Sequence, residues 1–401
     1  MSNTIIITIC SLILLAYVFD ITSSKTRIPS VILLLLVGWI MRQIGDVLGF
    51  QLPNLTPILS VMGTVGLILI VMEGALELEL NKSKLPVIRR SFIVSFFPII
   101  ILSLALAYAI SSIGGYPFRD SLVNAIPLAV ISSSIAIPSA ANLAAGKREF
   151  VIYESSLSDI FGVLLFDFFV LNDTITTGSL LHFLLQLLAI IAISFSASAF
   201  LSYLLSKIEH HIKFAPIILL VILIYGLSKI YHLPALVFIL AFGLFLGNLD
   251  ELKRIKWVQK LHPQDLNSEV KKFREISIEA AFVVRAIFFL LFGYVIETAE
   301  LLNPETLLWA VCIVAGIFLI RAIQLRAVGL PLMPLLFIAP RGLITILLFL
   351  SIPVSLSVDI INRPLIIQII ILTGFIMMAG LIFSHKNKEV DREEPDAAPQ
   401  L

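Results

Sequence analysis

Two carboxylates lie inside an apolar stretch of the chain, at the ends of the segment Glu154–Asp159, which also holds three serines. A charged side chain at the centre of a bilayer costs roughly 2.5–3.5 kcal/mol on insertion scales, so such residues persist where they are paired or do chemistry. Glu154 and Asp159 are five residues apart, about 140° around a helix and roughly 7.5 Å along it. We therefore expect the two carboxylates to face different neighbours and to have different roles.

Hydroxyl groups accompany the second carboxylate. Ser155 lies one helical turn before Asp159 on the same face, and carboxylate and hydroxyl oxygens together suit a small cation or a proton. Burial favours the protonated form of a carboxyl, whereas a bound cation favours the ionised form. We predict that Asp159 binds the proton and the metal cation. We expect the supporting ligands to be Ser155, Ser158, Ser133 and Ser134. The serines of the run 132–134 could instead cap helix ends.

The composition is that of a polytopic membrane protein. The chain has 401 residues, 59% hydrophobic and 14% charged, whereas about 25% of a soluble domain is charged. A net charge of +1 argues against a nucleic-acid partner. Cys10 and Cys312 lie in apolar stretches, so they indicate neither a disulfide framework nor a metal site. Residues 4–20 lack a basic segment before them, which predicts a retained helix rather than a signal peptide.

Apolar windows of about 20 residues, the length that crosses a bilayer, predict an all-α fold of thirteen transmembrane helices. The expected spans are residues 4–20, 28–47, 56–79, 86–112, 121–145, 149–171, 179–206, 213–231, 233–248, 277–297, 305–328, 331–352 and 363–384. The loop 249–276 is charged and amphipathic, so we expect it to lie along the membrane surface, and residues 385–401 form a short polar tail.

Basic residues predict the orientation of these spans. Of the 28 Lys and Arg residues, 21 follow odd-numbered spans, and those that follow even-numbered spans are Arg42, Arg119, Lys229 and Arg363. The positive-inside rule then places the N-terminus outside the cell membrane and the C-terminus in the cytoplasm.

Three arginines, Arg285, Arg321 and Arg341, lie within spans, where a charge is a functional candidate by default. Glu154 and Arg321 lie at similar depths from the cytoplasmic ends of their spans. A pair at about 4 Å and an effective dielectric constant near 20 gains about 4 kcal/mol. We therefore expect a structural ion pair between them, with Arg285 as the rival partner of Glu154.

The other buried charges are expected to play supporting roles. Arg341 could offset the carbonyl ends of a broken helix or hold a nearby carboxylate. Glu73 is predicted to be a structural partner of Arg285. Asp167 lies two turns beyond Asp159 towards the outside, where it could line an outer funnel.

Two spans are expected to be broken, at Ser132–Ser139 around Pro138 and at Ile338–Gly342 around Pro340. Proline removes a helix hydrogen bond, and the freed backbone is tolerated at membrane depth only where it is buried or lines a cavity. Either break alone is also typical of a packing kink. The fourth to sixth and eleventh to thirteenth spans, however, form two triplets of opposite orientation. Paired breaks in inverted repeats indicate the midplane site of a transporter.

These residues resemble the cation–proton antiporter superfamily, the sodium–proton exchangers and potassium–proton antiporters of thirteen-helix fold. The most specific similarity is Glu154-x-x-x-x-Asp159, where exchangers carry Glu-Ser-Leu-Leu-Asn-Asp and the last Asp binds the ion and the proton. Ser158 stands in place of the Asn. Ser133 stands in place of the exchangers' crossover Asp, which is closer to the potassium-efflux branch.

The resemblance extends over nearly the whole membrane chain. Phe288-Phe289 with Gly293 is similar to a Phe-Phe-x-x-x-Gly signature of the tenth span, Arg321 matches a basic residue of the eleventh, and Pro340-Arg341-Gly342 resembles a Leu-Arg-Gly of the twelfth. The resemblance implies a core domain (86–172 and 305–384) that moves against a panel (1–85 and 207–298), with residues 173–206 as a linker and the panel forming a homodimer.

The resemblance also implies an antiporter, a secondary active transporter rather than an enzyme, that exchanges Na⁺ or K⁺ for a proton and needs no cofactor. If Glu154 is held by Arg321, Asp159 is the only free carboxylate at the midplane, and one site shared by two monovalent ions gives electroneutral exchange. The main alternative is a sodium-coupled symporter of an organic anion. A channel would conduct ions without proton coupling. An intramembrane enzyme is disfavoured because the predicted spans hold neither a catalytic-looking His nor the paired Asp residues of a membrane protease.

Overall fold

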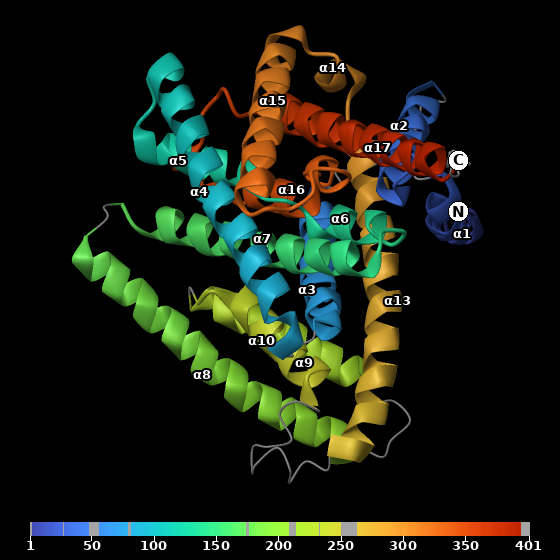
Figure 1. Cartoon of the computed structure of the whole chain (residues 1–401), viewed down its shortest axis with the longest axis vertical. Helices are drawn as coiled ribbons and strands as arrows, with labels where there is room; N and C mark the ends of the chain where they lie inside the picture. Colours follow the sequence, from blue (N-terminus) through green and yellow to red (C-terminus); the bar gives the residue numbers. More distant parts are fainter. Residues whose placement is uncertain are drawn as a thin grey trace, which may run out of the picture.

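The computed structural model describes residues 2–26, 28–47, 56–78, 82–173, 176–207, 214–231, 233–249 and 263–393, and all the regular secondary structure in these ranges is helical (Figure 1). The long helices are α1 (Ser2–Thr26), α2 (Ser30–Val47), α3 (Thr56–Glu77), α4 (Leu85–Gly114), α7 (Ala145–Leu171), α8 (Thr177–Lys207), α9 (Phe214–Ile230), α10 (Ala235–Gly247), α13 (Pro263–Val295), α15 (Pro304–Ala327) and α17 (Arg363–Glu393). Shorter pieces are η1 (Lys82–Lys84), α5 (Phe118–Ala129), α6 (Ser133–Ser139), α14 (Thr298–Leu301), η2 (Leu335–Phe337), α16 (Leu343–Leu350) and η3 (Val354–Leu356).

The helices confirm the predicted all-α architecture, with α5 and α6 forming the fifth span and η2 and α16 the twelfth. Eight segments of the described chain are long and apolar enough to cross a membrane on length and composition alone. The remaining predicted spans include α7, which carries both Glu154 and Asp159, and the short helices α9 and α10.

The tenth span differs from the sequence prediction at its start. Residues 263–276, which were expected to belong to the loop 249–276, are helical, because α13 begins at Pro263 and runs unbroken to Val295. No glycine or proline interrupts residues 264–292, so the charged, amphipathic segment continues into the apolar one as a single helix. Residues 250–262 of the expected loop, and 394–401 of the expected tail, lie outside the described residues.

One group of helices packs closely through glycines. Helix α13 lies against α2 and α3, and α10 lies against α3 and α8 (Figure 1). A Cβ atom at Gly38 of α2 would lie 2.2 Å from the Leu290 carbonyl oxygen, and one at Gly293 of α13 would lie 2.3 Å from the Leu35 carbonyl oxygen. Glycine at both positions lets the two backbones approach to a distance that any larger residue would prevent.

A second group of helices surrounds the breaks. Helix α4 packs against α5, α7 and α15, while α15 packs against α17 and α16 packs against α5. Helix α8 runs along the edge of the molecule, beside α10 and away from α15 and α17 (Figure 1). The two groups meet where α3 contacts α6, α7 and α16.

Both predicted spans are broken, and the two breaks lie against each other; the second break is where it was predicted, but the first lies at 130–132, because the predicted stretch around Pro138 forms helix α6. Helix α5 ends at Ala129 and α6 begins at Ser133, while the chain between η2 and α16 is non-helical from Ile338 to Gly342. The Ser132 backbone N–H donates to the Pro340 carbonyl oxygen at 3.0 Å, which joins the two breaks directly. Of the stretch predicted to be broken, Ser132 lies in the break, whereas Ser133–Ser139, Pro138 included, belongs to α6.

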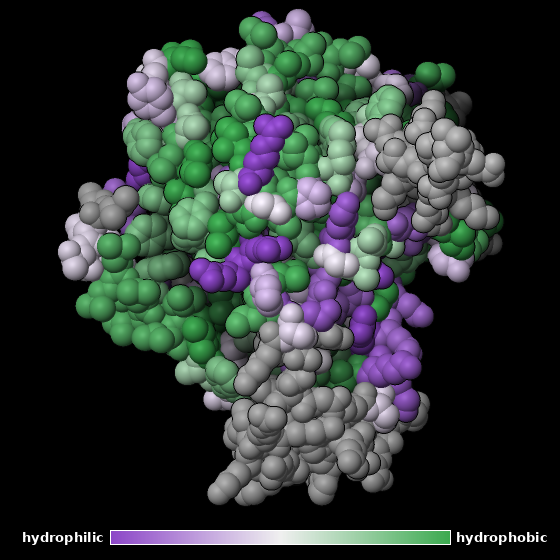
Figure 2. Space-filling model, viewed as in Figure 1, coloured by the Kyte–Doolittle hydropathy of each residue, from purple (hydrophilic) through white to green (hydrophobic). Residues whose placement is uncertain are grey.

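The outer surface is that of a protein in contact with lipid. Figure 2 shows a face covered largely by hydrophobic residues, with most hydrophilic residues gathered across the middle and towards the lower right of the view. Large apolar side chains that are more than half exposed occur on α4, α8, α9 and α15, for example Tyr108, Leu188, Leu219 and Leu308. Apolar patches of this extent are expected where a bilayer replaces water.

Candidate functional site

The crossing of the two broken spans is tightly packed. Gly342 adopts an extended conformation at the start of α16, with φ −169°. A Cβ atom at this position would lie 2.6 Å from Ile135 Cδ1 and 3.0 Å from Ser132 Oγ. Glycine at 342 therefore leaves room for the side chains of Ile135 and Ser132 at the first break. This contact and the Ser132–Pro340 hydrogen bond hold the two half-helices in register.

Arg341 satisfies the backbone that the breaks release. Its Nε donates to the Leu128 carbonyl oxygen at 2.8 Å, its Nη2 to that of Ala129 at 3.1 Å and its Nη1 to that of Ala339 at 2.8 Å. The last carbonyls of a helix have no intrahelical partner and carry partial negative charge. The fully buried guanidinium thus offsets the C-terminal end of α5, the first of the two roles expected for it.

Asp159 lies at this crossing on the middle of α7. The residue is 1% exposed, and its Oδ2 accepts a hydrogen bond from the Ser133 hydroxyl at the start of α6. Its Oδ1 is buried and has no hydrogen-bond partner within the described part of the chain. A buried carboxylate without a compensating partner is strongly disfavoured. A proton or a cation on Oδ1 would supply the missing partner.

The other predicted ligands make different contacts. The Ser158 hydroxyl accepts from the Ile131 backbone N–H at 2.9 Å, so it satisfies the break. The Ser134 hydroxyl bonds that of Ser132 at 2.8 Å. The Ser155 hydroxyl donates to the Val151 carbonyl of its own helix at 2.8 Å. Each hydroxyl oxygen keeps lone pairs, but only Ser133 among them is hydrogen bonded to Asp159.

Glu154 and Arg321 join α7 to α15 by a two-pronged ion pair. Arg321 Nη1 donates to Glu154 Oε1 at 2.7 Å, and Nη2 donates to Oε2 at 3.0 Å. The two side chains are 1% and 4% exposed, and Arg321 Nε also donates to the Leu335 carbonyl oxygen of η2 at 2.8 Å. Arg285, the rival partner, lies on α13 in the other helix group. The planar guanidinium of Arg321 binds both carboxylate oxygens of Glu154, which is the bidentate geometry typical of arginine–carboxylate pairs.

The expected partnership between Glu73 and Arg285 is not formed as an ion pair. No salt bridge links the two residues within the described part of the chain, and Glu73 Oε2 has no hydrogen-bond partner there. Glu73 precedes Gly74, where a Cβ atom would lie 2.9 Å from Ser156 Oγ of α7. Glu73 thus lies beside the contact between the two helix groups.

Asp167 is ion paired at the outer half of α7. Both of its carboxylate oxygens lie 3.2 Å from Lys229 Nζ at the end of α9. Asp167 is 19% exposed and Lys229 is 43% exposed. The pair joins a helix that carries the candidate site to a helix of the other group.

Two polar residues that the sequence analysis did not single out support the crossing. The Thr373 hydroxyl on α17 accepts from the Arg341 backbone N–H at 3.1 Å. The Asn124 side chain on α5 donates to the Leu356 carbonyl oxygen at 2.7 Å, which ties α5 to η3. Both are buried polar residues in apolar spans, and that isolation was the signal available in the sequence.

A family model described as sodium/hydrogen exchanger, transmembrane, matches residues 10–385. The chain belongs to the sodium/hydrogen exchanger family. No curated protein matches the chain significantly.

Solved structures of the same fold add to this assignment. This exchanger-family chain is similar to the sodium proton antiporter MjNhaP1 from Methanocaldococcus jannaschii at pH 8, with 19% identity, TM-score 0.65 and coverage of 97% of this chain and 98% of that one. An electron-microscopy structure of MjNhaP1 matches with 17% identity, TM-score 0.69 and full coverage of both chains. At these identities the similarity shows the fold.

Proposed function

We propose that this member of the sodium/hydrogen exchanger family exchanges a monovalent cation, Na⁺ or K⁺, for a proton across the cell membrane. Asp159 is the shared binding residue: it holds either the proton or the cation, and the occupancy of one excludes the other. Mutually exclusive occupancy is sufficient for coupling, because the carrier then crosses loaded with one ion or the other. No cofactor takes part.

The observation that carries this proposal is the unpartnered, buried Oδ1 of Asp159. Its other oxygen is oriented by Ser133, and the nearby backbone ends are already neutralised by Arg341. Glu154 is occupied by Arg321. Among these charged groups at the crossing, Asp159 is the one with coordination capacity left for a transported ion.

Alternating access requires one helix group to move against the other. The proposed core comprises α4–α7 and α15–α17, and the proposed panel comprises α1–α3, α9, α10 and α13, with α8 as the linker. The contact of α3 with α6, α7 and α16 is then the sliding interface. In this proposal the panel mediates a homodimer, the N-terminus is outside and the C-terminus is cytoplasmic.

Reconstituted liposomes with an internal pH dye test the function. Addition of Na⁺, K⁺ or Li⁺ salts in turn, without an organic substrate, should drive proton flux for at least one cation, and the series gives the selectivity. Asp159→Asn keeps the side-chain volume but removes the charge, so it should abolish this flux while the protein remains folded. Retained cation-driven proton flux in Asp159→Asn would disprove the assignment of Asp159.

A further inference from the structure

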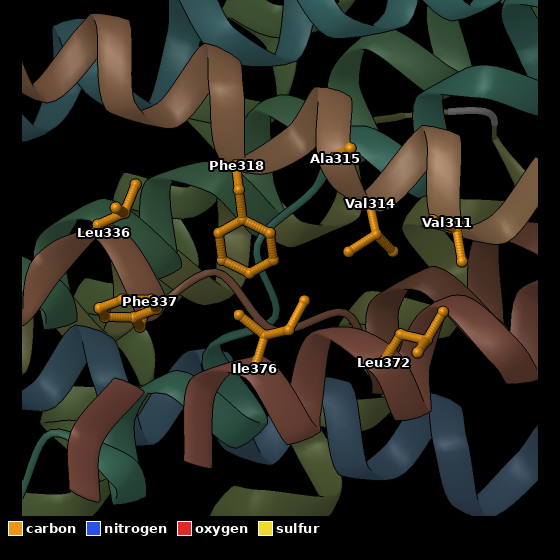
Figure 3. A pocket seen from close by; sticks show the side chains of 8 residues that line it. All are labelled: Val311, Val314, Ala315, Phe318, Leu336, Phe337, Leu372 and Ile376. Carbon is orange, nitrogen blue, oxygen red and sulfur yellow. The ribbon is translucent and has the colours of Figure 1, made fainter. Parts of the chain in front are cut away.

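An apolar cavity lies between α15 and α17, away from Asp159. It has a volume of about 370 Å³, and Figure 3 shows the side chains of α15, η2 and α17 turned towards one another around it. The lining residues are Val311, Val314, Ala315, Phe318, Leu336, Phe337, Leu372 and Ile376. All eight are hydrocarbon or aromatic side chains, so the cavity favours an apolar ligand.

The inner wall of the cavity is built by a close contact. A Cβ atom at Gly380 of α17 would lie 1.9 Å from Phe337 Cγ, so the Phe337 ring rests directly on the glycine. The η2 turn is thereby held against α17, while the Arg321–Leu335 hydrogen bond holds it against α15, and the space between α15 and α17 is open on the side where Val311 is 50% exposed. The cavity is therefore a defined feature of the packing, open to the membrane.

The depth of the cavity matches the acyl-chain region of a bilayer. On α15, Phe318 at the near end of the cavity lies roughly 13 Å from the inner helix end at Ala327, and Val311 at its far end lies roughly 10 Å from the outer end, so the cavity lies across the middle of the bilayer, where the ends of acyl chains meet. A single leaflet of hydrocarbon is about 15 Å thick. At roughly 30 Å³ per water-sized group, which is close to the size of a methylene, the cavity has room for about a dozen carbons.

A cationic side chain lies at the inner end of the same helix. Arg326 is two turns beyond Phe318, in the last turn of α15. Its side chain is exposed and makes no ion pair with the described residues. An anionic headgroup at Arg326 would place its acyl chain along the α15–α17 groove up to the cavity, because the separation is roughly 12 Å along the helix.

We propose that this cavity binds one acyl chain of an anionic phospholipid of the inner leaflet, with the headgroup at Arg326. The bound chain packs against Leu336 and Phe337. The adjacent residue, Leu335, gives its carbonyl to Arg321, which in turn holds Glu154 on α7. The lipid thus stabilises the turn that supports the buried ion pair, and it is a structural ligand whichever cation is exchanged.

Photolabelling in lipid nanodiscs tests the site. Phosphatidylglycerol with a diazirine at the end of its acyl chain should label the cavity residues, and Ala315→Trp, which fills the cavity, should abolish this labelling. The matched control Cys312→Trp places the same side chain on an exposed neighbouring face of α15 and should leave it intact. Val311→Trp, at the exposed rim, replaces Ala315→Trp if that variant does not fold. Labelling that persists in the filled variant, or spreads evenly over exposed residues, overturns the proposal.

Headgroup recognition is tested with the same probe. The phosphatidylglycerol probe should label the cavity more efficiently than a phosphatidylcholine probe, and Arg326→Gln should remove this difference without moving the labelled residues. Equal labelling by the two lipids in the unsubstituted protein overturns the role of Arg326. Neither readout uses ion transport, so a failure of the proposed exchange activity would not be confused with a failure of the lipid site.

Discussion

The helix crossing and the proposed panel are built by opposite means. At the crossing, broken helices are held by polar contacts, with Arg341 bound to three carbonyl oxygens and Ser132 bound to Pro340. In the panel, unbroken helices meet through glycines, as at Gly38 and Gly293 between α2 and α13. The crossing retains a buried carboxylate oxygen, Asp159 Oδ1, that has no hydrogen-bond partner among the described residues.

This difference separates rigidity from ion binding. Backbone-to-backbone packing through glycine leaves little freedom to shift, because interiors are close-packed. At the polar crossing, the broken helices lack some of the hydrogen bonds of a continuous helix, and breaks of this kind form the ion-binding sites of transporters. We therefore expect changes at the crossing to affect transport or the buried ion pair, and changes in the panel to affect stability.

The largest effect is expected from joining the two groups at their outer edge. With Cys10 and Cys312 replaced by Ser, Asp167→Cys and Lys229→Cys would carry thiols at the α7–α9 ion pair. A short, reducible bis-methanethiosulfonate cross-linker should stop cation-driven proton flux, and a reductant should restore it, because the core can no longer move against the panel.

A matched pair lies within the core on the same side. Tyr116 and Asp359 are joined by a 3.3 Å hydrogen bond between Tyr116 Oη and Asp359 Oδ2. Cross-linked cysteines at these two positions should leave transport unchanged. Undiminished flux in the cross-linked 167–229 variant would show that α7 and α9 do not move apart during transport.

The buried ion pair should give the next largest effect. Glu154→Gln leaves Arg321 buried without its counter-charge and should destabilise the protein by about 3–5 kcal/mol. The double variant Glu154→Gln with Arg321→Gln should recover much of this loss, measured as thermal stability in a double-mutant cycle. Strictly additive losses would show that the pair contributes no coupling energy.

A glycine substitution in the panel should have a smaller effect. Gly293→Ala places a methyl group 2.3 Å from the Leu35 carbonyl oxygen and should cost about 1–3 kcal/mol, as overpacking does. Gly316→Ala on α15, where a Cβ atom meets nothing within 4 Å, is the control and should change the melting temperature little. Equal melting temperatures for the two variants would contradict close packing of α2 on α13.

Membrane potential should have the smallest effect. One monovalent ion in each direction moves no net charge, whereas a net charge would couple at about 2.3 kcal/mol per 100 mV. An imposed potassium–valinomycin potential should therefore leave the equilibrium pH gradient of sodium-driven exchange unchanged. A shift would indicate a second titrating carboxylate. Glu73, which has no salt bridge to Arg285, is then a better suspect than Asp167, which is paired with Lys229.

Much of the architecture could be predicted from the sequence because membrane spans and breaks leave local signals. Apolar windows predicted the thirteen spans, and Pro340 with Gly342 predicted the second break. The first break begins at Val130, before the serines, because Arg341 holds the carbonyls of Leu128 and Ala129 from another part of the chain. Such a contact over two hundred residues leaves no local pattern.

Pairing was predictable only where depth alone decided it. Glu154 and Arg321 lie at matching depths, and they form the buried ion pair in the structure. Glu73 and Arg285 also lie at similar depths, but the rotation of α3 about its axis decides whether they meet, and a sequence does not give that rotation. The apolar window predicts a tenth span that starts at residue 277, whereas α13 begins at Pro263, because a helix can continue into a charged segment that a window of apolar residues does not detect.

Proton release on cation binding tests the central claim most directly. Sodium or potassium chloride would be added to the purified protein in weakly buffered detergent over a series of pH values, with a pH dye as the readout. Wild-type protein should release protons when the cation binds, and Asp159→Asn should release none, because Asp159 holds either ligand but not both. The same proton release from Asp159→Asn would contradict the account.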